Sequence, residues 1–235
     1  MTNKRNYNGR IASTLAAGAM LLPGAGYAQN PVKGEVELFS DGGITTTDTK
    51  VLVPSVNPNG TLLKKLGMFL RNRNTVDSRE TQITSGSFSL GDVTYNVLGG
   101  LDAVYEHQFL PNGQSVPLVG AQYFTKMGRN KDLTLYGLGV VSLRDDEQIP
   151  RYAEVIGKVA YNPKLTENLK GVAQLEAVTN FGGNGVNFAV QRARLGIEHK
   201  NGFAGGIGAD IVETPSKTGD VAIDKVVGLW LRKSF

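Results

Sequence analysis

Apolar and polar residues alternate along the chain from about residue 93 onward, in segments of about ten residues or more. A period of two is typical of a β-strand, because successive side chains point to opposite faces of a sheet. Short turn sequences such as Pro111-Asn112-Gly113 and Asn201-Gly202 separate the segments, which predicts consecutive antiparallel hairpins. The expected strands are 93–109, 115–127, 132–143, 152–161, 169–179, 186–199, 203–212 and 225–235, with two weaker ones at 62–72 and 80–89.

The two faces of these expected strands differ in charge. Odd-numbered positions are mostly apolar or small, whereas even-numbered positions carry many charges. The charged even positions include Asp102, Glu106, Lys126, Glu154, Lys158, Lys170, Glu176, Arg192, Arg194, Glu198, Asp210 and Arg232. A soluble β-sandwich or a lipocalin-like barrel, with one face in a core and one in water, explains the alternation alone. A membrane barrel with its odd face in lipid is the other interpretation.

The carboxy-terminal segment favours the membrane barrel. An alternating run of Val227, Leu229 and Leu231 leads to the aromatic residue Phe235. This run resembles the carboxy-terminal signal of bacterial outer-membrane β-barrel proteins, although Lys233 stands where an apolar residue is usual in that class. The resemblance covers the leader and residues 62–235, and it is to the class and not to one family. It implies an all-β fold: a closed antiparallel up-and-down transmembrane β-barrel in the outer membrane of a Gram-negative bacterium.

Aromatic residues on the odd face are a second indication. In that class the carboxy terminus is periplasmic, and successive strands run in opposite directions. Counting strand ends backward from Phe235 therefore assigns each aromatic residue on the odd face to the periplasmic rim or to the opposite rim. Ten residues separate Tyr95 from Tyr105. A strand that rises about 3.3 Å per residue and is tilted near 45° would place these two residues roughly 23 Å apart along the barrel axis, which is close to the height of the apolar band. The residues expected near the periplasmic rim are Tyr95, Tyr123, Tyr161, Phe203 and Phe235. Those expected near the opposite rim are Tyr105, Phe109 and Phe181.

Glycine inside the expected strands is the third indication. Glycine weakens a strand, but the sharp coiling of a small closed barrel gives it a role. Gly206, Gly208 and Gly228 would be neighbours on the even face, together with Trp230. We expect the Trp230 ring to cover these glycines and fill the gap. A small ligand pocket floored by Trp230 is the alternative.

The amino-terminal segment has the layout of a secretory signal peptide. Three basic residues accompany an apolar stretch from Ile11 to Leu22, and a small-residue cleavage site ends at Ala28. The apolar stretch is shorter than the roughly 20 residues of a membrane-spanning helix. We therefore expect residues 1–28 to be removed and the mature protein to reach the bacterial outer membrane.

The strand number depends on the segment that follows the leader. Residues 61–235 account for about ten strands, an even number that places both termini on the periplasmic side. Residues 29–60 contain a further possible hairpin, 35–40 against 50–53, which would raise the number to twelve. Alternatively, residues 29–60 form a periplasmic extension or a partial plug.

On this topology the even face lines the interior of the barrel. Arg192 would lie opposite Asp210 and close to Glu176. Glu154 would stand beside Glu176, where a cation must separate the two carboxylates. The expected ion-pair belt consists of Glu154, Lys158, Lys170, Glu176, Arg192, Arg194, Asp210 and Arg232. Because both signs occur, a salt-bridged, sealed interior is favoured over an ion-selective constriction, in which one sign usually dominates.

Composition excludes several classes of site. The chain has no cysteine and two histidines, so it offers no thiolate ligand or nucleophile and little for a metal. His107 and His199 would lie at opposite ends of the barrel, and neither has a serine and an acid beside it in a recognisable motif. We therefore expect no enzyme, no cofactor and no metal; a rim-site hydrolase using His107 is the enzymatic alternative. Without its leader the chain is nearly neutral, which argues against nucleic acid as a partner.

The expected function is that of a non-enzymatic integral outer-membrane barrel. It would be a narrow passive channel for small polar solutes or a structural barrel with a charge-paired interior. The alternative is an anchoring barrel that binds a periplasmic or surface partner through residues 29–60. The expected partners are outer-membrane lipid and lipopolysaccharide, and the barrel-assembly machinery, which would recognise Phe235.

Overall fold

The computed structural model describes residues 33–53, 66–77, 84–110, 113–146, 149–183, 185–215 and 221–235. These residues form twelve antiparallel strands, each paired with the next along the chain, and β1 pairs with β12 to close the sheet. The strands are β1 (Lys33–Ser40), β2 (Ile44–Val53), β3 (Leu66–Asp77), β4 (Thr84–Leu98), β5 (Leu101–Phe109), β6 (Ser115–Met127), β7 (Leu133–Ser142), β8 (Tyr152–Tyr161), β9 (Leu169–Gly182), β10 (Gly185–His199), β11 (Phe203–Pro215) and β12 (Val221–Ser234). Within these ranges, no helix is long and apolar enough to cross a membrane.

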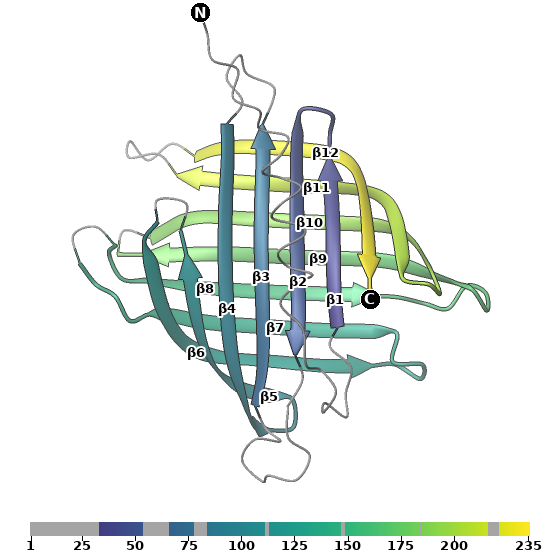
Figure 1. The fold of residues 1–235 in the computed structure, drawn as a ribbon, viewed down its shortest axis with the longest axis horizontal. Coiled ribbons are helices and arrows are strands. Elements are labelled where there is room, and N and C mark those ends of the chain that lie inside the picture. The colour runs from purple at the N-terminus through teal and green to yellow at the C-terminus, as the bar shows by residue number, and fades with distance from the viewer. Residues whose placement is uncertain are drawn as a thin grey trace, which may run out of the picture.

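The strands are strongly tilted around a closed wall. Figure 1 shows β1–β4 running steeply across the strands of the opposite wall. The prediction of an all-β, closed, antiparallel up-and-down barrel is confirmed, with the twelve strands of the alternative count. Residues 33–53 form the extra hairpin, β1 and β2, so this part of the chain is neither a plug nor a free arm. The leader 1–28 and residues 29–32 and 54–60 lie outside the described residues.

The first strong strand expected from the sequence is in fact parts of two strands. Gly99 and Gly100 form a two-residue turn between β4 and β5, and their φ angles of 45° and 91° are ones that glycine adopts readily. Tyr95 and Tyr105 therefore lie on neighbouring strands, and Tyr105 pairs with Val93. Their separation in sequence does not measure the height of an apolar band, so that expectation was wrong.

Side chains alternate between the inside and the outside of the barrel. In β5, Glu106 is buried, whereas Tyr105 and Phe109 are exposed. From β5 to β12 the odd-numbered positions point outward, as expected. The numbering is reversed in β1 and β3, where Phe39 points inward and Leu70 points outward. The nearly charge-free face expected from the sequence is thus the outer wall of β5–β12.

Two apolar clusters fill part of the interior. The first consists of Val104, Val116, Leu118, Leu138, Val140 and Ile149. Ile149 belongs to the loop between β7 and β8 and is 5% exposed. The second cluster consists of Phe39, Val172, Ala204, Val226 and Trp230. Buried polar and charged side chains share the interior with these clusters.

Candidate functional site

Asp48, on the inward face of β2, is the centre of one group of ion pairs. Its carboxylate accepts hydrogen bonds from Nε and Nη2 of Arg71 at 2.9 and 2.6 Å and from Nη2 of Arg73 at 2.6 Å. Lys50 Nζ lies 3.6 Å from the same carboxylate and 3.0 Å from Glu35 Oε1. The Asp48 side chain is 4% exposed, so these three cations offset the free-energy cost of burying its charge.

A second group connects β9, β10 and β11. Arg192 donates a hydrogen bond to Glu176, and its Nε lies 3.7 Å from Asp210. Arg194 donates to Asp210 at 2.5 Å and to Glu37 of β1 at 3.1 Å. Because β1 and β10 are not neighbours in the sheet, the Arg194–Glu37 bond crosses the interior and joins two parts of the wall.

A third group extends the ion pairs around the seam of the barrel. Arg232 of β12 donates to Glu198 of β10 at 2.7 Å, and its Nε lies 3.7 Å from Glu35 of β1. Glu35 also binds Lys50, which links this group to Asp48. Acids and bases thus alternate along the interior wall, and the chain shows no dominant sign that would select anions or cations.

In a part of the interior on β4, β5 and β8, amide and phenol groups hydrogen-bond around buried carboxyl groups. Asp92 and Glu106 are cross-strand neighbours and are 5% and 1% exposed. Gln108 donates to Glu106, and the Tyr152 hydroxyl donates to Gln108 Oε1 at 2.8 Å. Since β6 and β7 separate β5 from β8, the Tyr152–Gln108 bond also crosses the interior. This side is therefore closed by amide and phenol groups.

Trp230 is the largest buried side chain and is 1% exposed. Its Nε1 lies 2.9 Å from the carbonyl oxygen of Ile207 and 3.3 Å from that of Leu195, and donates to both. A Cβ on Gly196 would lie 2.9 Å from the indole ring, and one on Gly206 would lie 2.0 Å from the Leu195 oxygen. The indole thus packs on glycine backbone with its N–H satisfied, which favours packing over a ligand pocket.

The structure brings most of the expected belt and packing residues together. They lie on the inward face as cross-strand neighbours. The neighbouring pairs are Arg192–Asp210, Arg192–Glu176, Lys158–Glu176, Trp230–Gly206 and Gly208–Gly228. Arg194 and Arg232 join them through the bonds given above.

Two of the expected belt residues lack the neighbours expected for them. Glu154 does not stand beside Glu176: it pairs with Asn180. The pairing of β8 with β9 ends at Tyr161, and the first four residues of β9 extend past it, which shifts the register by four positions from the expected one. Lys170, among those four residues, is exposed and forms an isolated bridge with Lys164.

Part of the charged interior was missed by sequence reasoning. The missed residues are Glu35, Glu37, Asp48, Lys50 and Arg73. They lie on strands that were counted as weak or left out of the barrel. The signal available was a pair of charges two positions apart in each strand, because residues i and i+2 share a face. Glu35 with Glu37 and Asp48 with Lys50 are such pairs.

The expected girdle residues lie on the outer wall. Tyr123, Tyr161, Phe203 and Phe235 are all at least 46% exposed and lie toward one end of the barrel, where the chain ends. Tyr95 lies toward the same end of β4. Phe109 and Phe181 are 53% and 40% exposed and lie toward the opposite end. Tyr105 lies in the middle of β5 and is not a rim residue.

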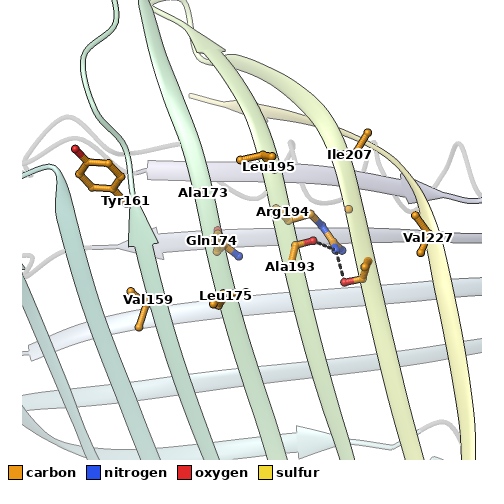
Figure 2. A pocket seen from close by; sticks show the side chains of 12 residues that line it. Val159, Tyr161, Ala173, Gln174, Leu175, Ala193, Arg194, Leu195, Ile207 and Val227 are labelled. Atoms are coloured by element: carbon orange, nitrogen blue, oxygen red, sulfur yellow. Dashed lines mark hydrogen bonds between the residues drawn. The ribbon is translucent and has the colours of Figure 1, made fainter.

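A groove of about 450 Å³ runs along the outer wall over β8–β12. Figure 2 shows Leu175, Leu195, Ile207 and Val227 around it. Ala173, Ala193 and Ala209 contribute to its lining. Most of its lining residues are on the outward face, so the groove opens to the surroundings of the barrel.

Histidine chemistry finds no support in the described residues. His107 lies on the outer face between Tyr105 and Phe109, with its ring stacked 4.9 Å from that of Phe109. His199 is at the end of β10, away from His107. Among the residues that the structure describes, no group of three or more acidic or histidine side chains is arranged to hold a metal ion.

Two solved structures are similar to this chain in outline. One is the crystal structure of an outer-membrane channel from Pseudomonas putida F1, with a TM-score of 0.45 and 11% identity over 92% of this chain and all of that one. The other is a bacterial polysaccharide outer-membrane secretin, with a TM-score of 0.41 and 8% identity over 87% of this chain and 97% of that one. No protein-family model and no curated protein matches. The resemblance to outer-membrane barrels therefore stays at the level of the class.

Proposed function

We propose that this protein is an integral, non-enzymatic β-barrel of a bacterial outer membrane whose charge-paired interior gives it a structural role. The observation that carries the proposal is the inverted polarity of the wall. Leu175, Leu195, Val227 and Leu229 are 59–72% exposed on the outer face. Asp48, Glu106, Glu154, Glu176 and Arg194 are at most 9% exposed on the inner face.

Lipid on the outer face explains this inversion. Burying a leucine or valine side chain away from water stabilises a protein by about 1.5–3 kcal/mol, and the outer wall leaves many such side chains uncovered. Hydrocarbon would cover them. The closed sheet satisfies every ladder hydrogen bond without an edge, which is a condition for a β structure in lipid. The aromatic residues toward both ends of the barrel are placed as in interfacial girdles.

The filled interior supports a structural role over an open pore. Two apolar clusters and a chain of ion pairs occupy it, and two hydrogen bonds, Arg194–Glu37 and Tyr152–Gln108, cross it. Ion pairs of both signs in such an interior hold the walls together and leave little room for a solute.

Gel mobility and planar-bilayer recording on the refolded barrel test this proposal together. A folded barrel should migrate differently before and after boiling, and should remain in the detergent or lipid phase. A structural barrel should give no discrete current steps. A protein that is freely soluble without detergent would contradict the membrane location, whereas steady conductance would contradict the sealed interior.

A narrow passive channel for small polar solutes is the second candidate, favoured by the position of Ile149. This residue descends from a loop into the apolar cluster inside the barrel, so a rearrangement of that one loop would unblock one mouth. If steps appear in the bilayer, Arg192→Glu should move the ion selectivity toward cations. An unchanged selectivity would place the current path away from the ion-pair chain.

A further inference from the structure

Three exposed lysines lie close together in the chain fold at the end of the barrel where the chain ends. Lys164 belongs to the loop between β8 and β9, Lys170 is the second residue of β9, and Lys200 lies in the turn between β10 and β11. Lys164 and Lys170 form an isolated bridge. The Lys200 backbone N–H donates to the carbonyl oxygen of Asn168 at 2.8 Å. These contacts place the three residues on adjoining segments of backbone, and we call them the lysine cluster.

No acid neutralises the lysine cluster. Glu198 is the cross-strand neighbour of Lys170, but its carboxylate binds Arg232 at 2.7 Å. Glu167, in the same loop as Lys164, is exposed. Within the described ranges, neither acid forms an ion pair with a lysine of the cluster. Because like charges on opposed residues repel, an anion held between Lys164 and Lys170 would stabilise this arrangement.

The groove over β8–β12 begins beside the lysine cluster. Tyr161, the last residue of β8, lines the groove and precedes Lys164 by three positions. On β9 the first lining residue is Ala173, which follows Lys170 by three positions, or about 10 Å along the strand. The lining continues over β10 and β11 to Val227 of β12 (Figure 2). The groove therefore leads from the lysine cluster into the apolar outer wall.

The groove and the cluster match the two parts of a charged lipid. Most of the groove is lined by alanine, leucine, isoleucine and valine, and its volume of about 450 Å³ suits an acyl chain. Tyr161 and Phe203 are outward aromatic residues at this end of the barrel, as in an interfacial girdle. The lysines lie just past them, at the depth of lipid headgroups, where basic side chains attract anionic phosphate. Lys233, 4.1 Å from the centre of the Phe203 ring, adds a further cation there.

We propose that the lysine cluster and the groove together bind one anionic glycerophospholipid, with its phosphate at the lysines and an acyl chain in the groove. The proposal rests on the membrane location proposed above. The carboxy-terminal end is periplasmic in the class that this chain resembles, and the periplasmic leaflet of an outer membrane consists of phospholipid. A neutral lipid would fill the groove but leave the lysines without a counterion.

Native mass spectrometry of the refolded barrel in detergent measures this site directly. The barrel is titrated with phosphatidylglycerol and, separately, with phosphatidylcholine that carries the same acyl chains. One phosphatidylglycerol should bind per barrel, about tenfold more tightly than phosphatidylcholine. Added salt should weaken the binding of phosphatidylglycerol and reduce this difference, because it screens exposed charges.

Two sets of variants separate the headgroup from the acyl chain. The double variant Lys164→Gln, Lys170→Gln should weaken the binding of phosphatidylglycerol roughly tenfold and leave that of phosphatidylcholine unchanged. Ala193→Phe, which fills the groove, should weaken the binding of both lipids. Arg129→Gln, on the exposed β6–β7 turn at the same end, and Ala121→Phe, outward on β6, are the matched controls. Neither lies at the groove, and both should bind like the wild type.

The outcomes distinguish this site from the membrane location. A chain whose gel mobility does not change on boiling would contradict both proposals. A folded, heat-modifiable barrel that binds no lipid, or binds both lipids equally, would overturn only the site. Unchanged binding by a folded Ala193→Phe barrel would overturn the groove as the position of the acyl chain. Tighter binding of lipid A than of phosphatidylglycerol, lost in the same variants, would assign the site to lipopolysaccharide and overturn the phospholipid.

Discussion

The ring of Phe235 lies over Gly34 at the seam where the barrel closes. The two residues exchange backbone hydrogen bonds of 2.8 and 3.0 Å, and a Cβ on Gly34 would lie 2.2 Å from the Phe235 ring. Gly34→Val should therefore displace the ring and lower the free energy of unfolding by about 1–3 kcal/mol. Urea titration followed by the fluorescence of Trp230, the single tryptophan, measures the change.

Gly157→Val is the control for this substitution. A Cβ at Gly157 would meet nothing within 4 Å, although Gly157 also points outward from a strand. The control should unfold near the wild-type midpoint. Equal stability of the two variants would show that the ring of Phe235 moves aside without cost.

Asp48 is the acid on which three buried cations depend. Asp48→Asn removes the charge and leaves Arg71, Arg73 and Lys50 without their shared partner. Breaking a buried ion pair on one side costs about 3–5 kcal/mol, so the variant should unfold at much lower urea. Glu167→Gln, on an exposed turn, should leave the midpoint unchanged. A wild-type midpoint for Asp48→Asn would mean that water solvates these cations and that the interior is open.

Trp230 should stabilise the folded barrel both by filling space and by its hydrogen bonds. Trp230→Ala leaves a cavity over Gly196 and Gly206 and should cost about 3–5 kcal/mol. Trp230→Phe keeps most of the ring but removes the N–H that binds two carbonyl groups, so it should lie between Ala and wild type. Because both variants lack the fluorophore, the temperature at which the folded gel band disappears is the measurement. Equal losses for both would show that packing contributes little. Glu167→Gln, at an exposed position outside the strands, should leave this temperature unchanged.

Local pairings could be predicted from the sequence where the connecting turn is tight. Arg192 and Asp210 face each other across the Asn201-Gly202 turn, and its short length fixes the register of β10 against β11. The neighbour of Glu154 was predicted wrongly because the connection from β8 to β9 is long and does not fix the register. The first residues of β9 extend beyond the end of β8. The Gly99–Gly100 turn was missed because apolar alternation continues through it on both sides.

Contacts that depend on closure could not be predicted. The Arg194–Glu37 bond joins residues 157 positions apart, and it exists because β12 returns to β1. The charges of β1–β3 are spaced two residues apart, as expected on one face of a strand, but these segments were counted as weak or left out of the predicted barrel. On these strands inward and outward positions change parity from one strand to the next, so a single odd–even rule does not apply to them.

Ile149 connects the loop between β7 and β8 to the interior. Asp146 holds this loop by accepting the backbone N–H of Ile149 at 2.8 Å, and the side chain packs with Leu118 and Val140. Ile149→Asp places a charge in this apolar cluster, so the loop should leave the mouth. If the rest of the interior admits ions, the variant should conduct more than the wild type in planar bilayers. Leu165→Asp, at an exposed position in the β8–β9 loop, should behave as wild type. A silent but folded Ile149→Asp barrel would show that the ion-pair chain and Trp230 seal the interior on their own.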